Sequence, residues 1–230
     1  MPYKRVIAIG DSFTRGDELA DCPPHSEVDN CASISTWPAL LAKSTDAKYQ
    51  SYALGGAGNQ WISFYANCRA KQDALHVINW TWFERFDYVD PANNSWRTTH
   101  PRHHDQLNHY FYRNIDSDIW NLLRNLQIMH STIQLLKQNN LQFIMTCLDR
   151  NYQSAAENET NGNVEWMSAI LRLRHLVSPY IIDFEDMSFL EWSKHNNYKL
   201  GPHGHPLEKA HIEAAKYINT IITKESQNEH

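Results

Sequence analysis

The chain has 230 residues, 42% of them hydrophobic and 12% aromatic, which suits one domain with a packed core. Its formal net charge of −5 argues against a nucleic-acid partner, because such binders need clustered Lys and Arg to displace counterions. No stretch approaches the roughly 20 apolar residues that span a bilayer, and the short apolar run near the start is unlike a signal peptide. We therefore expect a cytoplasmic location and no membrane or nucleic-acid partner.

Short apolar runs typical of buried strands alternate with segments whose apolar residues recur at helical spacing. In chain order, the strands are predicted over residues 5–9, 49–54, 76–79, 141–147 and 180–183. The helices are predicted from residues 36–38 onward and over residues 60–70, 115–137, 164–176, 189–195 and 211–223. Thr36 and Asn59 are suited to cap the first two helices. The alternation predicts a single α/β domain over residues 1–230, a three-layer α/β/α sandwich around a parallel sheet of five strands.

The segment from about residue 80 to residue 114 has no clean period and is rich in His and aromatic residues. We interpret it as an irregular insertion after the third strand, and insertions of this length are often functional. Most of its aromatic side chains are expected to pack against the core. Trp80 and Trp82 are the best candidates for lining a substrate pocket, because they directly follow the third strand, and ligands gather at strand ends in parallel sheets.

A cluster of histidines in this insertion raises the hypothesis of a metal site: His100, His103, His104 and His109. A tetrahedral site needs three or four ligands at fixed geometry. No helical pattern places two of these histidines on one face, so we favour a solvated or substrate-facing loop. We expect no metal and no cofactor.

The cysteines Cys22, Cys31, Cys68 and Cys147 include no Cys-x-x-Cys pair of the kind that holds zinc or performs redox chemistry. Cys147 lies in an apolar run and is predicted to be a core thiol. Cys22 and Cys31 flank a polar loop, where a disulfide would require an oxidising compartment.

Ser12 is the first candidate for chemistry, because Ile-Gly-Asp-Ser-Phe-Thr places it just past the first strand. A serine at the N-terminus of a helix or turn is well placed to support a developing negative charge. The alternative is that Ser12 only caps that turn.

Two further segments provide polar groups at the same edge of the sheet. Gly55-Gly56-Ala57-Gly58-Asn59 follows the second strand, and its backbone N–H groups and the Asn59 amide are suited to an oxyanion hole. Alone, it is equally typical of a tight strand-to-helix turn. His205, in Gly-Pro-His-Gly-His-Pro before the last helix, is placed to act as a general base for Ser12.

Gly10-Asp11-Ser12-Phe13-Thr14, Gly56 and the segment from His205-Pro206 to His211 together resemble the conserved blocks of the SGNH (GDSL-type) hydrolase superfamily, in the same order along the chain. The resemblance covers almost the whole chain and implies the flavodoxin-like fold of these enzymes. It implies that Ser12 attacks an ester carbonyl and that His205 transfers the proton. It also implies that the N–H groups of Ser12 and Gly56 hold the oxyanion together with one Asn side chain.

The chain departs from this family pattern in two places. The family has Gly-x-Asn-Asp after the third strand, where this chain has Asn79-Trp80-Thr81-Trp82. Asn59 or the Thr81 hydroxyl is the expected replacement donor, and we prefer Asn59. Asp11 is a further candidate for support of the site.

The second departure concerns the base. The family has an Asp two or three residues before the His, where this chain has Pro202 and His203. His203 could orient His205, the pair could work as a dyad held by a backbone carbonyl, or Asp183 or Asp186 could fold in as the carboxylate.

The sequence thus predicts a serine esterase that cleaves a small or carbohydrate-linked O-acyl ester, with O-acetyl as one possibility. The alternative is a weakly active or inactive SGNH-fold module for binding or structure. The variant blocks are similar to those of proteins from bacteria and their viruses, so a virion-associated location is a second expectation beside the cytoplasm.

Overall fold

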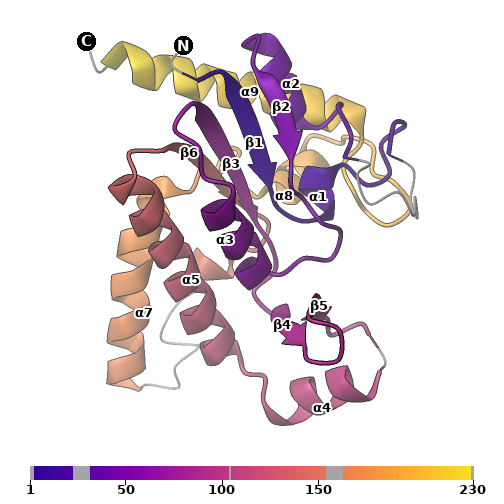
Figure 1. Cartoon of the computed structure of the whole chain (residues 1–230), viewed down its shortest axis with the longest axis vertical. Coiled ribbons are helices and arrows are strands. Elements are labelled where there is room, and N and C mark those ends of the chain that lie inside the picture. Colours follow the sequence, from indigo (N-terminus) through magenta and orange to yellow (C-terminus); the bar gives the residue numbers. More distant parts are fainter. Residues whose placement is uncertain (1–2, 23–31, 104, 154–162, 229–230) are drawn as a thin grey trace.

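The computed structural model describes residues 3–22, 32–103, 105–153 and 163–228. Within these residues, four parallel strands form the central sheet in the order β2-β1-β3-β6. The strands are β1 (Arg5–Ile9), β2 (Lys48–Ser51), β3 (Ala74–Trp80) and β6 (Gln142–Cys147). Figure 1 shows the sheet between two groups of helices. The predicted three-layer α/β/α sandwich is therefore confirmed.

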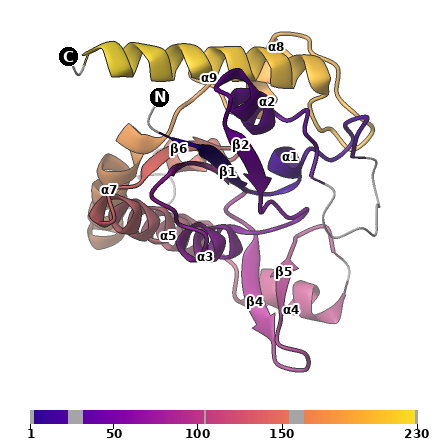
Figure 2. The ribbon, with the colours of Figure 1, turned by 45° about the horizontal axis from the view of Figure 1, so that its top comes forward.

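The helices cover the two faces of the sheet as separate layers (Figure 2). One layer contains α3 (Asn59–Cys68), α5 (Asp118–Gln138) and α7 (Val164–Val177), and the other contains α2 (Trp37–Ser44), α8 (Phe189–His195) and α9 (Glu208–Asn228). Two short helices, α1 (Ser12–Arg15) and the 3₁₀ turn η1 (Arg150–Gln153), follow strand ends. Among the described residues, no helix combines the length and apolar character needed to cross a membrane.

Two hydrophobic cores lie on the two faces of the sheet because side chains alternate along each strand. In β3, Ile78 and Trp80 pack with α3, α5 and α7, whereas Leu75 and Val77 pack with α2, α8 and α9. Every residue of β3 is buried, as expected for a central strand covered on both faces. Cys147 is buried in the first core, which confirms it as a core thiol. Cys31 lies outside the described residues, so the Cys22–Cys31 disulfide is still only a prediction.

The predicted fifth strand at residues 180–183 is wrong. Ser178–Tyr180 form a 3₁₀ turn, and pairing with β6 is limited to a single parallel bridge between Ile181 and Met145. Pro179 lies in this turn and has no N–H to donate. After one further hydrogen bond, from Ile182 N to Met145 O, the chain turns away and buries Phe184 among the aromatic side chains of the second core.

The insertion is regular rather than irregular. It contains an antiparallel hairpin of β4 (Phe86–Asp90) and β5 (Ser95–Thr99), followed by α4 (Gln106–Asn114). Asn94 adopts a left-handed conformation (φ 54°) in the hairpin turn, which Asn tolerates better than most residues. Figure 1 shows these elements at one end of the molecule. The hairpin is short and half exposed, so its period-2 pattern is too weak to recognise in the sequence.

Asn59 does not cap α3, contrary to the prediction. Gly58 is the N-cap, and the carboxylate of Asp87 in β4 accepts hydrogen bonds from Gly58 N (3.0 Å) and Trp61 N (2.8 Å). A Cβ at Gly58 would lie 2.6 Å from this carboxylate, so the contact requires glycine. The buried carboxylate of Asp87 thus joins the insertion to the N-terminus of α3.

Candidate active site

Ser12 is the first residue of α1, directly after the turn that ends β1. Asp11 is the N-cap and accepts a hydrogen bond from Phe13 N (3.0 Å). A Cβ at Gly10 would lie 2.2 Å from the Thr14 hydroxyl, so only glycine allows the strand to turn this tightly into the helix. The Ser12 side chain is held at the carboxyl end of the sheet, almost buried, with Asp11 occupying the cap position.

His205 lies beside Ser12, although 193 residues separate them in sequence. Its Nε2 is 2.9 Å from Ser12 Oγ, and its Nδ1 is 2.7 Å from Oε2 of Glu18. The Phe13 ring packs against the imidazole with ring centroids 4.9 Å apart. Three side chains therefore form a continuous hydrogen-bonded chain of hydroxyl, imidazole and carboxylate.

Glu18 is the carboxylate partner that sequence reasoning missed. It also accepts hydrogen bonds from the backbone N–H groups of His203 (2.9 Å) and His205 (3.2 Å). Burial by itself raises the pKa of Glu18, but the hydrogen bonds from these two residues outweigh it, so the pKa is lowered overall. Glu18 is thus ionised near neutral pH. An ionised carboxylate at Nδ1 requires a proton there, which leaves Nε2 free to accept the Ser12 proton.

The position of Glu18 depends on two backbone features that cannot be recognised from a sequence pattern. Glu18 has a left-handed backbone conformation (φ 72°), shortly after Gly16 (φ 86°) ends α1. A Cβ at Gly201 would lie 2.6 Å from the Glu18 carboxyl group, so the loop approaches this closely only with glycine. The nearby carboxylates Asp17 and Asp21 give the sequence no means of singling out Glu18. Asp183, one of the predicted alternatives, instead accepts hydrogen bonds from Tyr152 and Gln153.

Asp11 connects the Ser12 segment to the insertion. Its Oδ2 accepts hydrogen bonds from the Thr81 hydroxyl (2.7 Å) and from Nη1 of Arg85 (3.2 Å). The same Nη1 donates to Ala57 O (2.8 Å) and to Thr81 Oγ1 (2.9 Å). Asp11 is fully buried and Arg85 is only 6% exposed, so the carboxylate and the guanidinium compensate each other's desolvation.

The two expected replacements for the missing oxyanion donor are both engaged elsewhere. Asn59 Nδ2 donates to Thr81 O (3.1 Å) and to Asn125 Oδ1 (2.8 Å), so neither amide hydrogen is left for an oxyanion. The single hydroxyl hydrogen of Thr81 is donated to Asp11. The Asn59 side chain instead holds the backbone of Thr81 beside α3, and the Thr81 hydroxyl holds Asp11, which corrects their predicted role. Arg85, in contrast, has a buried Nε without a hydrogen-bond partner among the described residues.

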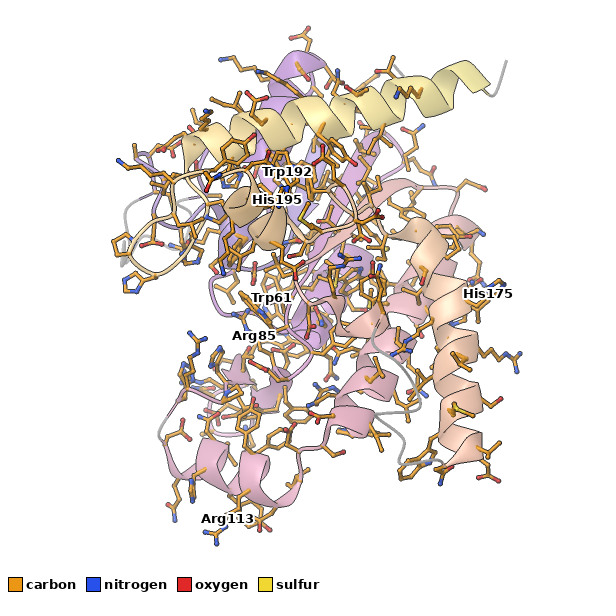
Figure 3. All side chains as sticks on the ribbon, turned by 180° about the vertical axis from the view of Figure 1, so that it is seen from behind. Trp61, Arg85, Arg113, His175, Trp192 and His195 are labelled. Atoms are coloured by element: carbon orange, nitrogen blue, oxygen red, sulfur yellow. The ribbon has the colours of Figure 1, made fainter. Side chains whose placement is uncertain are left out.

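A cavity of about 440 Å³ opens above the hydrogen-bonded chain. Ser12, His205, His203 and Trp82 line it, together with Arg85, which Figure 3 shows where the insertion meets the body of the molecule. Arg85 lies over the Trp82 ring, 4.7 Å from its centroid. Trp80 is fully buried in the first core and does not line the cavity, contrary to the prediction. Residue 80 ends a strand covered on both faces, and its side chain points into the helix layer.

Two of the described histidines of the insertion, His100 and His103, lie near each other, with ring centroids 5.3 Å apart. His100 lines the cavity above Ser12, whereas His103 and His109 line a different surface cavity, of about 680 Å³. His104 lies outside the described residues. Within the described part of the chain, no three His, Cys, Asp or Glu side chains come together as a possible metal site.

Comparison with known proteins reveals similarity in structure alone. No family profile and no curated protein sequence matches the chain. A lipolytic protein of the G-D-S-L family from Desulfitobacterium hafniense superposes with a TM-score of 0.50 at 16% identity, over 95% of this chain and 99% of that one.

Two larger carbohydrate esterases are also similar. An acetyl xylan esterase from Butyrivibrio proteoclasticus superposes with a TM-score of 0.50 at 13% identity, over 98% of this chain and 65% of that one. A family 2 carbohydrate esterase from Corynascus thermopiles (Myceliophthora fergusii) gives a TM-score of 0.52 at 16% identity, over 97% and 66%. The chain therefore has an SGNH/GDSL hydrolase-like fold.

Proposed function

We propose that this protein is a serine ester hydrolase in which Ser12 is the nucleophile, His205 the general base and Glu18 the carboxylate that supports the base. The observation that carries the proposal is the hydrogen-bonded chain through both nitrogens of His205, at 2.9 Å to Ser12 and 2.7 Å to Glu18. Both distances lie within the reach needed for proton transfer and for orientation of the imidazole.

In the first half of the reaction, Ser12 Oγ attacks the ester carbonyl carbon while its proton passes to His205 Nε2. The imidazolium that forms is stabilised by ionised Glu18 at Nδ1. The tetrahedral intermediate then breaks its bond to the alcohol oxygen, which takes the proton from Nε2 and leaves. The acyl group is now bound to Ser12 as an ester.

In the second half, His205 takes a proton from water, and the resulting hydroxide oxygen attacks the acyl carbonyl. Breakdown of this second intermediate returns the proton from Nε2 to Ser12 Oγ and releases the carboxylic acid. The same two proton transfers thus occur in each half-reaction, and the enzyme is regenerated.

The oxyanion of both intermediates needs preorganised donors. We assign the backbone N–H groups of Ser12 and Gly56 to this role and add the Arg85 guanidinium as the third donor. Three of the Arg85 contacts are made by Nη1, and they hold the guanidinium at the wall of the cavity that Ser12 also lines.

The expected substrate is a small or carbohydrate-linked O-acyl ester, such as an O-acetyl ester. Two of the structural neighbours are carbohydrate esterases, which supports this class. The Trp82 ring at the cavity wall provides a surface against which a sugar ring or an acyl group can pack. The absence of the family Asp favoured an inactive binding module, and Glu18 now provides the carboxylate that was missing.

The proposal is tested by active-site labelling. A fluorophosphonate probe is expected to modify the wild-type chain at Ser12, as located by peptide mass spectrometry, and to leave Ser12→Ala unlabelled. The matched control is Ser63→Ala on α3, which does not line the cavity and is expected to label fully. Absence of labelling in the folded wild-type chain, together with no hydrolysis of p-nitrophenyl acetate, would overturn the proposal in favour of a non-catalytic module.

A further inference from the structure

The cavity above Ser12 is rich in basic side chains, although the whole chain has a net charge of −5. The basic groups in its wall are three permanent cations and three histidines: Arg85, Arg102, Lys194, His100, His203 and His205. Glu84 is the one carboxylate in the described wall. Clefts lined by one sign of charge concentrate the field and favour ligands of the opposite sign.

Two of these cations approach the cavity from opposite walls. Arg102 follows β5 in the insertion, whereas Lys194 lies in the last turn of α8, in the layer that also contains α9. Both are exposed, and within the described residues neither forms an ion pair. Arg85 differs from them, because its charge is largely compensated by buried Asp11. Glu84 interacts electrostatically with Arg102 but forms no ion pair with it, so both Arg102 and Lys194 can still pair with a ligand.

The surroundings of His100 are consistent with a positive potential on the insertion wall. The pKa of His100 is lowered to about 4, mainly by burial and further by the nearby charges of Arg85 and Arg102. His100 is therefore neutral at neutral pH, and its Nδ1 accepts a hydrogen bond from Arg102 N (3.0 Å). This contact fixes the backbone of Arg102 while its guanidinium extends to the cavity.

We propose that the ester substrate is an acylated acidic sugar, whose carboxylate binds between Arg102 and Lys194 while its acyl group lies at Ser12. The proposal rests on the esterase activity proposed above. An acetyl group is small and carries no charge, so it gives the cations nothing to bind. A negative charge that pairs with Arg102 and Lys194 must therefore lie on the alcohol portion of the ester. The planar guanidinium of Arg102 matches a carboxylate with two parallel N–H donors, and Lys194 adds a second charge from the other wall.

The test compares two synthetic esters that differ in one group: methyl 3-O-acetyl-galacturonide, which carries a carboxylate, and methyl 3-O-acetyl-galactoside, which carries a hydroxymethyl group. We expect kcat/KM to be about tenfold higher for the galacturonide at low ionic strength. Arg102→Gln and Lys194→Gln are each expected to reduce this preference about threefold, and the double variant to abolish it. Added salt is expected to reduce the preference in the wild type, because exposed charges are screened.

The matched control is Lys43→Gln on α2, which changes the net charge equally but does not line the cavity. It is expected to leave both rates unchanged. Equal rates for the two sugars in the wild type, or a preference that the double variant retains, would overturn the proposal. In either case p-nitrophenyl acetate hydrolysis would persist, so this outcome is distinct from failure of the esterase proposal.

Equilibrium binding separates the charge argument from catalysis. Ser12→Ala protein is titrated with methyl galacturonide and with methyl galactoside and followed by NMR. We expect the galacturonide to bind more tightly, and the Arg102→Gln/Lys194→Gln changes in this background to remove the difference. Equal binding of the two sugars would contradict the proposal even if the protein hydrolysed no ester at all.

Discussion

Two carboxylates flank α1, the helix that begins with Ser12, and each joins it to a different part of the molecule. Asp11, before α1, accepts hydrogen bonds from Phe13 N, the Thr81 hydroxyl and Arg85, and so holds the insertion. Glu18, after α1, accepts hydrogen bonds from the backbone of His203 and from the backbone and ring of His205. The two carboxylates have similar numbers of partners but partners of different chemistry.

The difference lies in whether the partner can lose its proton. A guanidinium does not take part in proton transfer in proteins, so the pair of Arg85 with Asp11 is a fixed part of the structure. The imidazole of His205 gains and loses a proton during the proposed reaction, and Glu18 stabilises the charged form. Changes at Glu18 should therefore affect rate far more than folding, whereas changes around Asp11 should affect both.

The largest effect is expected from Glu18→Gln. With the Gln oxygen in the place of Oε1, it can still accept from His203 N, which keeps one anchor of the loop. Its NH₂ group then replaces Oε2, so the hydrogen bond from His205 N is lost and the NH₂ faces Nδ1. The imidazole proton would move to Nε2, where it blocks proton transfer from Ser12. We expect kcat to fall about 10³–10⁴-fold, as for the wrong tautomer, and Tm to fall by only a few degrees, because one hydrogen bond is lost. Steady-state kinetics and thermal melting check this, and a loss of less than tenfold would contradict the role of Glu18.

The next effect is expected at Arg85, where stability and rate should change together. Arg85→Met leaves the Asp11 carboxylate buried without its cation, so the free energy of unfolding should fall by about 3–5 kcal/mol. If Arg85 is also an oxyanion donor, kcat should fall about 10²-fold. Urea denaturation and esterase kinetics give the two quantities separately.

The double variant Asp11→Asn/Arg85→Met separates these two roles. It leaves no buried charge, and Asn can still cap α1, so much of the lost stability should return. The rate should stay low, because the guanidinium is still absent. Recovery of kcat together with stability would show that Arg85 only supports the fold.

A smaller effect is expected from His211, which holds the segment that carries His205. His211 Nδ1 accepts a hydrogen bond from Trp37 N (3.1 Å), and the ring is buried in the second core beside Phe189. Burial lowers the pKa of His211 to about 3. Below the unfolded-state pKa of about 6.5, the unfolded chain therefore binds a proton that the folded chain does not.

The resulting stability is present above about pH 6.5 and is lost as the pH falls toward the folded-state pKa of about 3. The loss from this group amounts to about 1.4 kcal/mol per pH unit within that window. In His211→Asn, whose amide oxygen can still accept from Trp37 N, unfolding free energies between pH 7 and pH 5 should depend less on pH. The exposed His195→Asn is the control and should follow the wild type. An unchanged slope in His211→Asn would contradict the buried neutral imidazole.

The sequence allowed site residues to be predicted where reactive side chains lie close to the ends of strands. Position at a strand end left Ser12 open between a cap and a nucleophile, and the resemblance of its segment and of the His205 segment to SGNH blocks decided the prediction. The structure places the two side chains 2.9 Å apart. Glu18 could not be predicted, because its approach to His205 depends on a left-handed backbone and on space at Gly201. Neither feature produces a pattern that can be recognised in the sequence.

The direction in which side chains point was the second feature that could not be predicted from the sequence. Trp80 is the last residue of β3 and packs into the first core, whereas Trp82 lies beyond the strand, where alternation no longer applies, and lines the cavity. Asn59 was assigned to the oxyanion because of its position after Gly56. Its amide is instead used by Thr81 and Asn125 across the helix layer. Such long-range partners depend on how the insertion packs, which the sequence does not reveal.

The smallest expected effect compares two buried carboxylates that each accept a hydrogen bond from a threonine hydroxyl. Thr81 donates to Asp11 (2.7 Å) beside the nucleophile, and Thr98 donates to Asp87 (2.6 Å) at the base of the hairpin. Thr81→Val and Thr98→Val keep the shape of the side chain and remove the hydroxyl. Each should lower the free energy of unfolding by about 1–2 kcal/mol, because a buried carboxylate loses one donor.

Only the change beside the nucleophile should alter the rate. Thr81→Val removes one of the three donors that hold Asp11, and Asp11 in turn sets the position of α1 and of Arg85. We expect kcat to fall severalfold in Thr81→Val and to stay unchanged in Thr98→Val, at similar losses of stability. Equal rates in the two variants would mean that Arg85 and the helix cap fix the nucleophile without Thr81. Catalysis would then tolerate the loss of one hydrogen bond to Asp11. It is not expected to tolerate a change at Glu18, which is the single carboxylate at Nδ1 of His205.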